Sequence, residues 1–275
     1  MRIIRKKDTV LIYIHPIRNG GTTLENYIDK LLLGKVISRK IFKHRDIELI
    51  ETKKYTHYSL EKSLEIIKKY GFNKINFITT IRNPYDWIKS VYLKTLLVQI
   101  NENKKFIYPI KKDIKFDNFL NFILALDISP QQSLIFSNNV SGELKLPKYL
   151  EIHLFENLKD VASNINIFLE INKNIKLNQL NSTSENNFQE FDVNKFFKKN
   201  KVLDEDFKKK FEFDFFLYNS LKKDNAINLN KIFNFEVSNK LNFMNIDPWW
   251  FLLTKELTPY LESKKFDKSI INPNL

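Results

Sequence analysis

The stretch that decides the fold is Val10–Leu33, which reads VLIYIHPIRNGGTTLENYIDKLLL. Its apolar start, Val10–Ile14, is typical of a strand. A helical pattern follows, because apolar side chains recur three or four positions apart at Leu24, Tyr27, Ile28, Leu31 and Leu32. Between them lie Gly20 and Gly21, two of the five glycines in the chain. The sequence therefore predicts a strand, a tight glycine turn and a helix.

Such a turn is suited to an anion. The first amides of a helix lack internal partners and carry the positive end of the helix dipole. Adjacent glycines let the backbone approach an oxyanion closely, Thr22 and Thr23 offer hydroxyls, and Arg18 adds a forked cation. A structural corner that uses glycine for tightness explains the same residues. The spacing is not the G-x-x-x-x-G-K-[ST] of nucleotide P-loops.

The composition favours a polyanionic partner. The 275 residues include 45 basic and 32 acidic side chains, for a net charge of +13. The alternative is compositional bias, since Lys, Asn, Ile and Phe are frequent throughout. The chain has no cysteine, and its four histidines lack metal-ligand spacing, so no thiolate or metal site is expected.

No apolar run approaches the roughly 18 residues of a membrane-spanning helix. The basic N-terminus is followed by an apolar run too short for a signal-peptide core. We therefore expect no integral membrane segment and a cytoplasmic protein that forms one domain over residues 1–275.

A second strand–turn–helix unit begins at Lys74–Ile81, which reads KINFITTI and predicts a central strand. Asn83 suits a helix N-cap and Pro84 the first helical position. Arg82 then stands at the end of the strand. Ligands of open α/β sheets bind where parallel strands end, so we expect Arg18 and Arg82 at the same edge.

The rest of the chain contains less decisive segments. The basic stretches 39–45 and 104–115 suit either an acidic glycan or a solvated surface. The remaining expected segments are an irregular region at 34–54, a helix over 60–70, a loop at 97–115, a helix over Asp117–Leu126, a strand over Tyr149–Phe155 with a helix to Leu169, a polar loop over Leu177–Asn187, a helix over Phe207–Leu221 and a C-terminal extension over 221–275.

The order of the motifs resembles that of the sulfotransferases that use 3′-phosphoadenosine 5′-phosphosulfate (PAPS), and most closely the carbohydrate sulfotransferases. The resemblance spans about residues 8–220. The motifs that carry it are HPIRNGGTT at 15–23, RNPYDWIKSVY at 82–92, FENL at 155–158, LNST at 180–183 and DFFLY at 214–218. Arg18 stands where the family usually has lysine, and Trp87 where an arginine is common.

The resemblance implies a role for each matching residue. His57 falls at the position of a catalytic base, and Arg18 also acts on the leaving group. Arg82 and Ser90 correspond to the pair that binds the 3′-phosphate, and Thr183 lies in the segment that closes over the nucleotide. The loop that holds the 5′-phosphosulfate corresponds to Arg18, Asn19, Gly20, Gly21, Thr22 and Thr23.

The resemblance also implies a fold and a reaction. The fold is α/β, with a central, mostly parallel sheet flanked by helices in the three-layer architecture of P-loop NTPases. The reaction is in-line transfer of the sulfuryl group from PAPS, without a metal, to a hydroxyl of a carbohydrate or related acceptor. No nucleic acid is expected as a partner.

Two other functions stay open from the residues. A nucleotide-dependent phosphotransferase fits the same architecture, but the chain lacks Gly-Lys-Ser/Thr and a clear acidic Mg²⁺ ligand after a strand. A non-catalytic basic module could bind nucleic acid or another polyanion. The aromatic residues are spread over expected core positions, however, and do not form a stacking face on one strand.

Overall fold

The decisive stretch folds as the sequence predicts. β2 (Thr9–Ile14) leads through a turn into α1 (Gly21–Leu33). The structure is a computed structural model, which describes residues 2–15, 18–33, 42–44, 47–50, 63, 72, 74–101, 114–125, 137–138, 144–145, 150–171, 175, 177 and 191–224.

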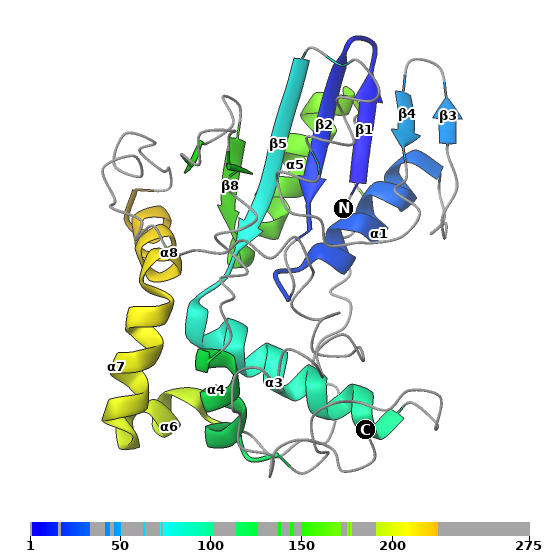
Figure 1. Cartoon of the computed structure of the whole chain (residues 1–275). Coiled ribbons are helices and arrows are strands. Elements are labelled where there is room, and N and C mark those ends of the chain that lie inside the picture. Colours follow the sequence, from blue (N-terminus) through cyan, green and yellow to red (C-terminus); the bar gives the residue numbers. More distant parts are fainter. Residues whose placement is uncertain are drawn as a thin grey trace.

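The described strands form a mixed sheet, so the fold is α/β (Figure 1). Its order is β3-β4-β1-β2-β5-β8, and a separate pair, β6–β7, lies apart from it. β2 and β8 both run parallel to β5, whereas β1 is antiparallel to β2 and β4, and β3 is antiparallel to β4. The bounds of the other strands are Arg2–Lys6 (β1), Phe42–His44 (β3), Ile47–Ile50 (β4), Lys74–Ile81 (β5), Ser137–Asn138 (β6), Leu144–Lys145 (β7) and Leu150–Leu154 (β8).

The predicted mostly parallel sheet is not confirmed, because antiparallel strands extend one side of it. β1 was not predicted at all. It pairs with β2 through a two-residue turn in which Lys7 has φ of 54°, and its only apolar side chains are Ile3 and Ile4, both fully buried. The prediction of an irregular region at 34–54 is wrong in part, because β3 and β4 pair there.

One face of the sheet is covered by α1 and α5 (Leu158–Leu169). Tyr27 on α1 donates a hydrogen bond of 2.8 Å to Asn166 Oδ1 on α5. The two helices and the strands share one apolar cluster that includes Ile4, Tyr13, Leu24, Ile28, Ile78, Val161 and Ile165. β2 is buried on both faces, as expected of a central strand.

A second, aromatic core lies among helices beyond the ends of β2 and β5 (Figure 1). These helices are α3 (Pro84–Asn101), α4 (Phe116–Ala125), α6 (Val193–Lys199), α7 (Lys201–Lys210) and α8 (Glu212–Asp224). Phe119, Phe207 and Phe211 are almost fully buried within it. Tyr85 packs against Phe207 with a ring-centroid distance of 5.6 Å, which ties the start of α3 to α7.

The remaining predictions have mixed outcomes. The strand at β8 and the helices at α4 and α5 are confirmed. α3 continues to Asn101, past the predicted start of a loop at 97, and the predicted helix over Phe207–Leu221 is divided between α7 and α8. Of the predicted helix over 60–70, the structure describes only Ser63, which is helical. Within the described ranges, no helix has the length and apolar character needed to cross a membrane.

Candidate functional site

The two strand–turn–helix units meet through Arg18, Arg82 and Ser90. Arg82 Nη1 donates a hydrogen bond of 3.3 Å to the backbone oxygen of Arg18. Arg18 Nε donates one of 2.9 Å to Ser90 Oγ on α3. The structure therefore brings together the two arginines that we expected at one edge of the sheet, and it adds Ser90 to the same cluster.

Buried hydrogen bonds fix the turn before α1 against β5. Asn19 is fully buried, and its Nδ2 donates to the backbone oxygen of Thr80 at 3.1 Å. Thr80 Oγ1 returns a bond of 2.7 Å to the backbone oxygen of Asn19. Thr79 Oγ1 donates to the backbone oxygen of Ile14 at 3.2 Å. These threonines were not predicted to matter, and their only sequence signal is two adjacent hydroxyls in the otherwise apolar second half of the strand.

The turn also contains unusual backbone geometry. Arg18 has φ of 61° and Gly20 has φ of 81°. For an L-residue other than glycine, this left-handed region costs about 1–2 kcal/mol. A Cβ on Gly20 would lie 2.8 Å from Leu158 Cδ1, so the turn also packs tightly against the start of α5. The surrounding contacts hold Arg18 in a conformation that it would not adopt alone.

The electrostatics of the cluster favour an anion. Burial, and then the positive charge of Arg82, lower the pKa of Arg18 to about 10. Burial also lowers the pKa of Arg82, while Asp86 and Glu156 act in the opposite direction. Both guanidinium groups stay charged at neutral pH, so two partly desolvated cations repel one another. An oxyanion between them would relieve this repulsion and accept forked hydrogen bonds.

Residues of the FENL and DFFLY motifs, for which the sequence predicted no role, stabilise Arg82. The guanidinium carbon of Arg82 lies 4.5 Å from the ring centroid of Phe155, in a cation–π contact. Tyr218 on α8 donates a hydrogen bond of 3.1 Å to Glu156 Oε1. Glu156 also favours the charged form of Arg82. The FENL and DFFLY motifs therefore meet at Arg82, and sequence reasoning missed these three supporting residues.

His15 and Gly21 interlock at the start of α1. A Cβ on Gly21 would lie 1.6 Å from His15 Cδ2, so the imidazole occupies the space of the absent side chain. His15 Nδ1 lies 3.0 Å from Glu25 Oε1. Burial lowers the pKa of His15 more than Glu25 raises it. Burial would raise the pKa of Glu25, but His15 and Arg2 hold it below its usual range.

The other predicted residues fall into two groups. Thr22 and Thr23 lie in the first turn of α1, with Thr22 partly exposed and Thr23 buried. His57 and Thr183 lie outside the described residues. Trp87, which stands where the resembled family has an arginine, is buried, and its ring centroid lies 5.6 Å from that of Phe211. It therefore belongs to the aromatic core.

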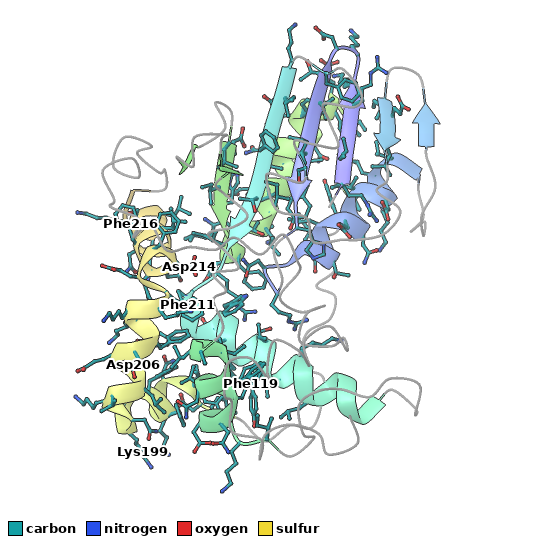
Figure 2. The ribbon with its side chains drawn as sticks, viewed as in Figure 1. Phe119, Lys199, Asp206, Phe211, Asp214 and Phe216 are labelled. Atoms are coloured by element: carbon teal, nitrogen blue, oxygen red, sulfur yellow. The ribbon has the colours of Figure 1, made fainter. Side chains whose placement is uncertain are left out.

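Asp214 on α8 is a buried acid that sequence reasoning missed (Figure 2). Its exposed fraction is 1%, and neither carboxyl oxygen has a hydrogen-bond partner within the described part of the chain. Burial raises its pKa to about 8, so it is largely protonated at neutral pH. Phe211, three residues earlier, packs on Trp87 of α3. The acid therefore lies next to the aromatic core and forms no part of the arginine cluster described above.

No protein-family model, curated protein or solved structure matches this chain.

Proposed function

We propose that the chain is a sulfotransferase that moves the sulfuryl group of PAPS to a hydroxyl of a carbohydrate or related acceptor. The observation that carries the proposal is the contact of Arg18 with both Arg82 and Ser90 where β2 and β5 end. These residues come from two of the motifs that carry the resemblance to sulfotransferases, HPIRNGGTT and RNPYDWIKSVY.

The donor set is chemically suited to PAPS. This nucleotide carries a phosphosulfate at its 5′ position and a phosphate at its 3′ position, and both are oxyanions. Arg18 and the N-terminal amides of α1 suit the 5′-phosphosulfate. Arg82 and Ser90 suit the 3′-phosphate, since a guanidinium binds phosphate oxygens in a forked geometry and a hydroxyl adds a further donor.

The finer fold assignment is part of the same proposal. In a P-loop-NTPase-like architecture, a phosphate loop joins a central strand to a helix, next to a parallel strand. β2, its turn and α1, with β5 parallel to β2, are compatible with that arrangement. The antiparallel strands β1, β3 and β4 would then extend the sheet on the side away from β5.

In the proposed reaction, the acceptor hydroxyl oxygen forms a bond to sulfur while the bond from sulfur to the 5′-phosphate oxygen breaks. His57 accepts the hydroxyl proton, because an imidazole titrates near neutral pH. Arg18 and the amides of α1 stabilise the negative charge that develops on the leaving oxygen. The products are the sulfated acceptor and 3′-phosphoadenosine 5′-phosphate (PAP).

The test is transfer of labelled sulfate from PAPS to a panel of neutral and acidic glycans. The wild type should transfer the label. His57→Ala should reduce turnover by at least about 100-fold, the usual lower contribution of a general base, while PAP binding persists. His153→Ala is the matched control, because His153 lies on β8 beside Glu151.

Two results would contradict the proposal. If His57→Ala retained turnover within about tenfold of the wild type, His57 would not be the base. If the wild type transferred phosphate from ATP with Mg²⁺ and no sulfate from PAPS, the chain would be a phosphotransferase.

A further inference from the structure

A row of buried polar side chains runs along one face of α1. Gly21, Glu25 and Asp29 are spaced four residues apart, so they share that face. His15, at the end of β2, lies between the first two, with its Nδ1 3.0 Å from Glu25 Oε1. Arg2, on β1, lies between the last two: its Nη1 is 3.8 Å from Glu25 Oε2 and its Nη2 is 3.1 Å from Asp29 Oδ2.

This row gives Gly21 a specific reason to be glycine. The imidazole of His15 fills the space beside its Cα, since a Cβ there would lie 1.6–2.2 Å from three ring atoms. The first residue of α1 is therefore packed directly on a histidine ring. Arg2 in turn holds Glu25 and Asp29, with a second bond of 3.2 Å from its Nε to Asp29 Oδ1. The start of α1 is thus connected to β1 and β2 through side chains with little exposure. His15, Glu25 and Asp29 are buried, and the side chain of Arg2 is 11% exposed.

We propose that His15 is a positioning residue of the anion site. Its imidazole, oriented by Glu25, fixes the first turn of α1, and a proton on that imidazole strengthens anion binding at the turn. The inference deepens the proposed function and rests on it for the anion site at Arg18 and Arg82. His15 itself is not proposed to take part in the chemistry.

The charges around His15 determine the sign of the effect. On α1, Glu25 contacts His15 directly, and Asp29 lies one turn further along the helix. Arg2 of β1 pairs with both acids. Tyr13 of β2 stacks on the imidazole with a centroid distance of 6.2 Å. Burial lowers the pKa of His15, so the ring is neutral at pH 8 and gains a proton only as the pH falls. That proton would add positive charge beside the N-terminus of α1, next to the proposed anion site. Anion affinity should therefore rise at lower pH.

The experiment is a titration with inorganic sulfate, which stays a dianion from pH 8 to pH 4.5. Because burial holds the pKa of His15 below the ordinary value of 6.5, affinity for the wild type should stay level near pH 8 and rise about tenfold only below pH 6.5, the effect of a nearby opposite charge. His15→Asn should bind sulfate with no such dependence. His153→Asn is the matched control, since it removes a histidine on β8, and it should keep the wild-type dependence. Thermal unfolding of each variant shows whether it is folded.

A second variant keeps the test decisive if His15→Asn does not fold. Glu25→Gln keeps the imidazole but removes the carboxylate that favours its protonation, so the pH dependence should shrink and shift to lower pH. A histidine with a purely structural role would change thermal stability in both variants and leave the pH dependence intact. That result would overturn the inference.

Competition with PAP separates this inference from the proposed function. If sulfate binds with the dependence on His15 but PAP does not compete, the inference holds and the proposed function fails. If PAP binds tightly and the His15 variants bind it and sulfate with wild-type pH dependence, the proposed donor site stands and the inference fails. If the wild type binds neither, both fail.

Discussion

The β2–α1 and β5–α3 corners each bring an arginine to the same place, but they begin their helices by different means. At β5–α3, Asn83 Oδ1 accepts a hydrogen bond of 2.9 Å from the backbone amide of Tyr85, and Pro84 starts the helix. At β2–α1, the residue before the helix is Gly20, which has no side chain to serve as a cap. Arg18 and Gly20 also have positive φ.

The difference suggests a division of roles. The β5–α3 corner satisfies its own backbone, so it contributes side chains, Arg82 and Ser90, to the cluster. The β2–α1 corner accepts backbone strain at Arg18, and strain of this kind concentrates at ligand sites. The two buried acids Glu25 of α1 and Asp214 of α8 differ as well, because Glu25 is paired with His15 and Arg2, whereas Asp214 has no hydrogen-bond partner among the described residues.

The largest effect should come from filling the space beside Gly21. Gly21→Ala should destabilise the protein by at least about 3 kcal/mol, because the new methyl group overlaps the ring of His15. Pro84→Ala, at the equivalent position of α3, should cost less than about 1 kcal/mol. Urea unfolding measures both.

A double variant checks the reason for this effect. Adding His15→Ala to Gly21→Ala removes the overlap, so the second substitution should cost much less in the Gly21→Ala background than in the wild type. Additive costs, or a Gly21→Ala variant as stable as the wild type, would contradict the interlock.

The two buried acids should give the next largest effect, as opposite responses to pH. Asp214 has a folded pKa of about 8 against an ordinary value of 3.8, so the folded state binds the proton more tightly. Its contribution therefore becomes less favourable as the pH rises from about 4 to about 8. Between pH 5 and pH 7, the wild type should lose about 2–3 kcal/mol relative to Asp214→Asn, as measured by urea unfolding.

Asp206→Asn, which removes an exposed acid of α7 (Figure 2), should instead follow the wild type across this pH range. Parallel curves for the wild type and Asp214→Asn would show that Asp214 is not protonated in the folded state.

Glu25 has a lowered pKa, so its stabilising contribution is present above an ordinary glutamate pKa of 4.5 and is lost as the pH falls below that value.

Removing the arginine of the β5–α3 corner should weaken donor binding. Arg82→Ala should reduce PAP affinity about 30-fold, or about 2 kcal/mol, because a charged hydrogen-bond donor is lost. Arg5→Ala is the matched control, since Arg5 pairs with Glu48 and lies opposite Val10, at the far end of β2. Calorimetric titration gives both affinities. Equal losses in the two variants would mean that PAP responds only to net charge.

The smallest effect should come from the cap of α3. Asn83→Ala should cost about 1 kcal/mol in urea unfolding, the usual cost of losing an N-cap side chain. PAP affinity should change little, because Asn83 caps the helix while Arg82 and Ser90 provide the proposed contacts. A large loss of affinity at unchanged stability would assign Asn83 to the ligand site and remove the distinction between the corners.

Local patterns predicted the elements that position the site. The apolar run before His15, the helical spacing after Gly21 and the Asn83–Pro84 start signal placed β2, α1 and the start of α3, whereas the end of α3 lies beyond the predicted start of a loop at 97. β1 escaped prediction because two apolar residues between basic ones do not form a strand pattern. Its pairing next to β2 made the sheet mixed.

The contacts that build the site depend on residues far apart in the sequence. Asn19 bonds to Thr80, and Arg18 bonds to Ser90, and no local periodicity relates the members of either pair. The row from His15 to Arg2 likewise depends on β1 lying beside β2. The position of Arg18 and Arg82 at one edge was predictable because parallel strands end together. Their direct contact required the structure.

The most direct test of the central claim, that the arginine cluster binds the donor nucleotide, is thermal unfolding with PAP, with ATP and Mg²⁺ as the comparison. At 100 times its Kd, PAP should stabilise the protein by about 2.7 kcal/mol and raise the Tm by about 5–10 °C. ATP with Mg²⁺ should raise it much less, and Arg82→Ala should reduce the PAP response. A shift with ATP and Mg²⁺ alone, or no shift with either nucleotide, would contradict the claim.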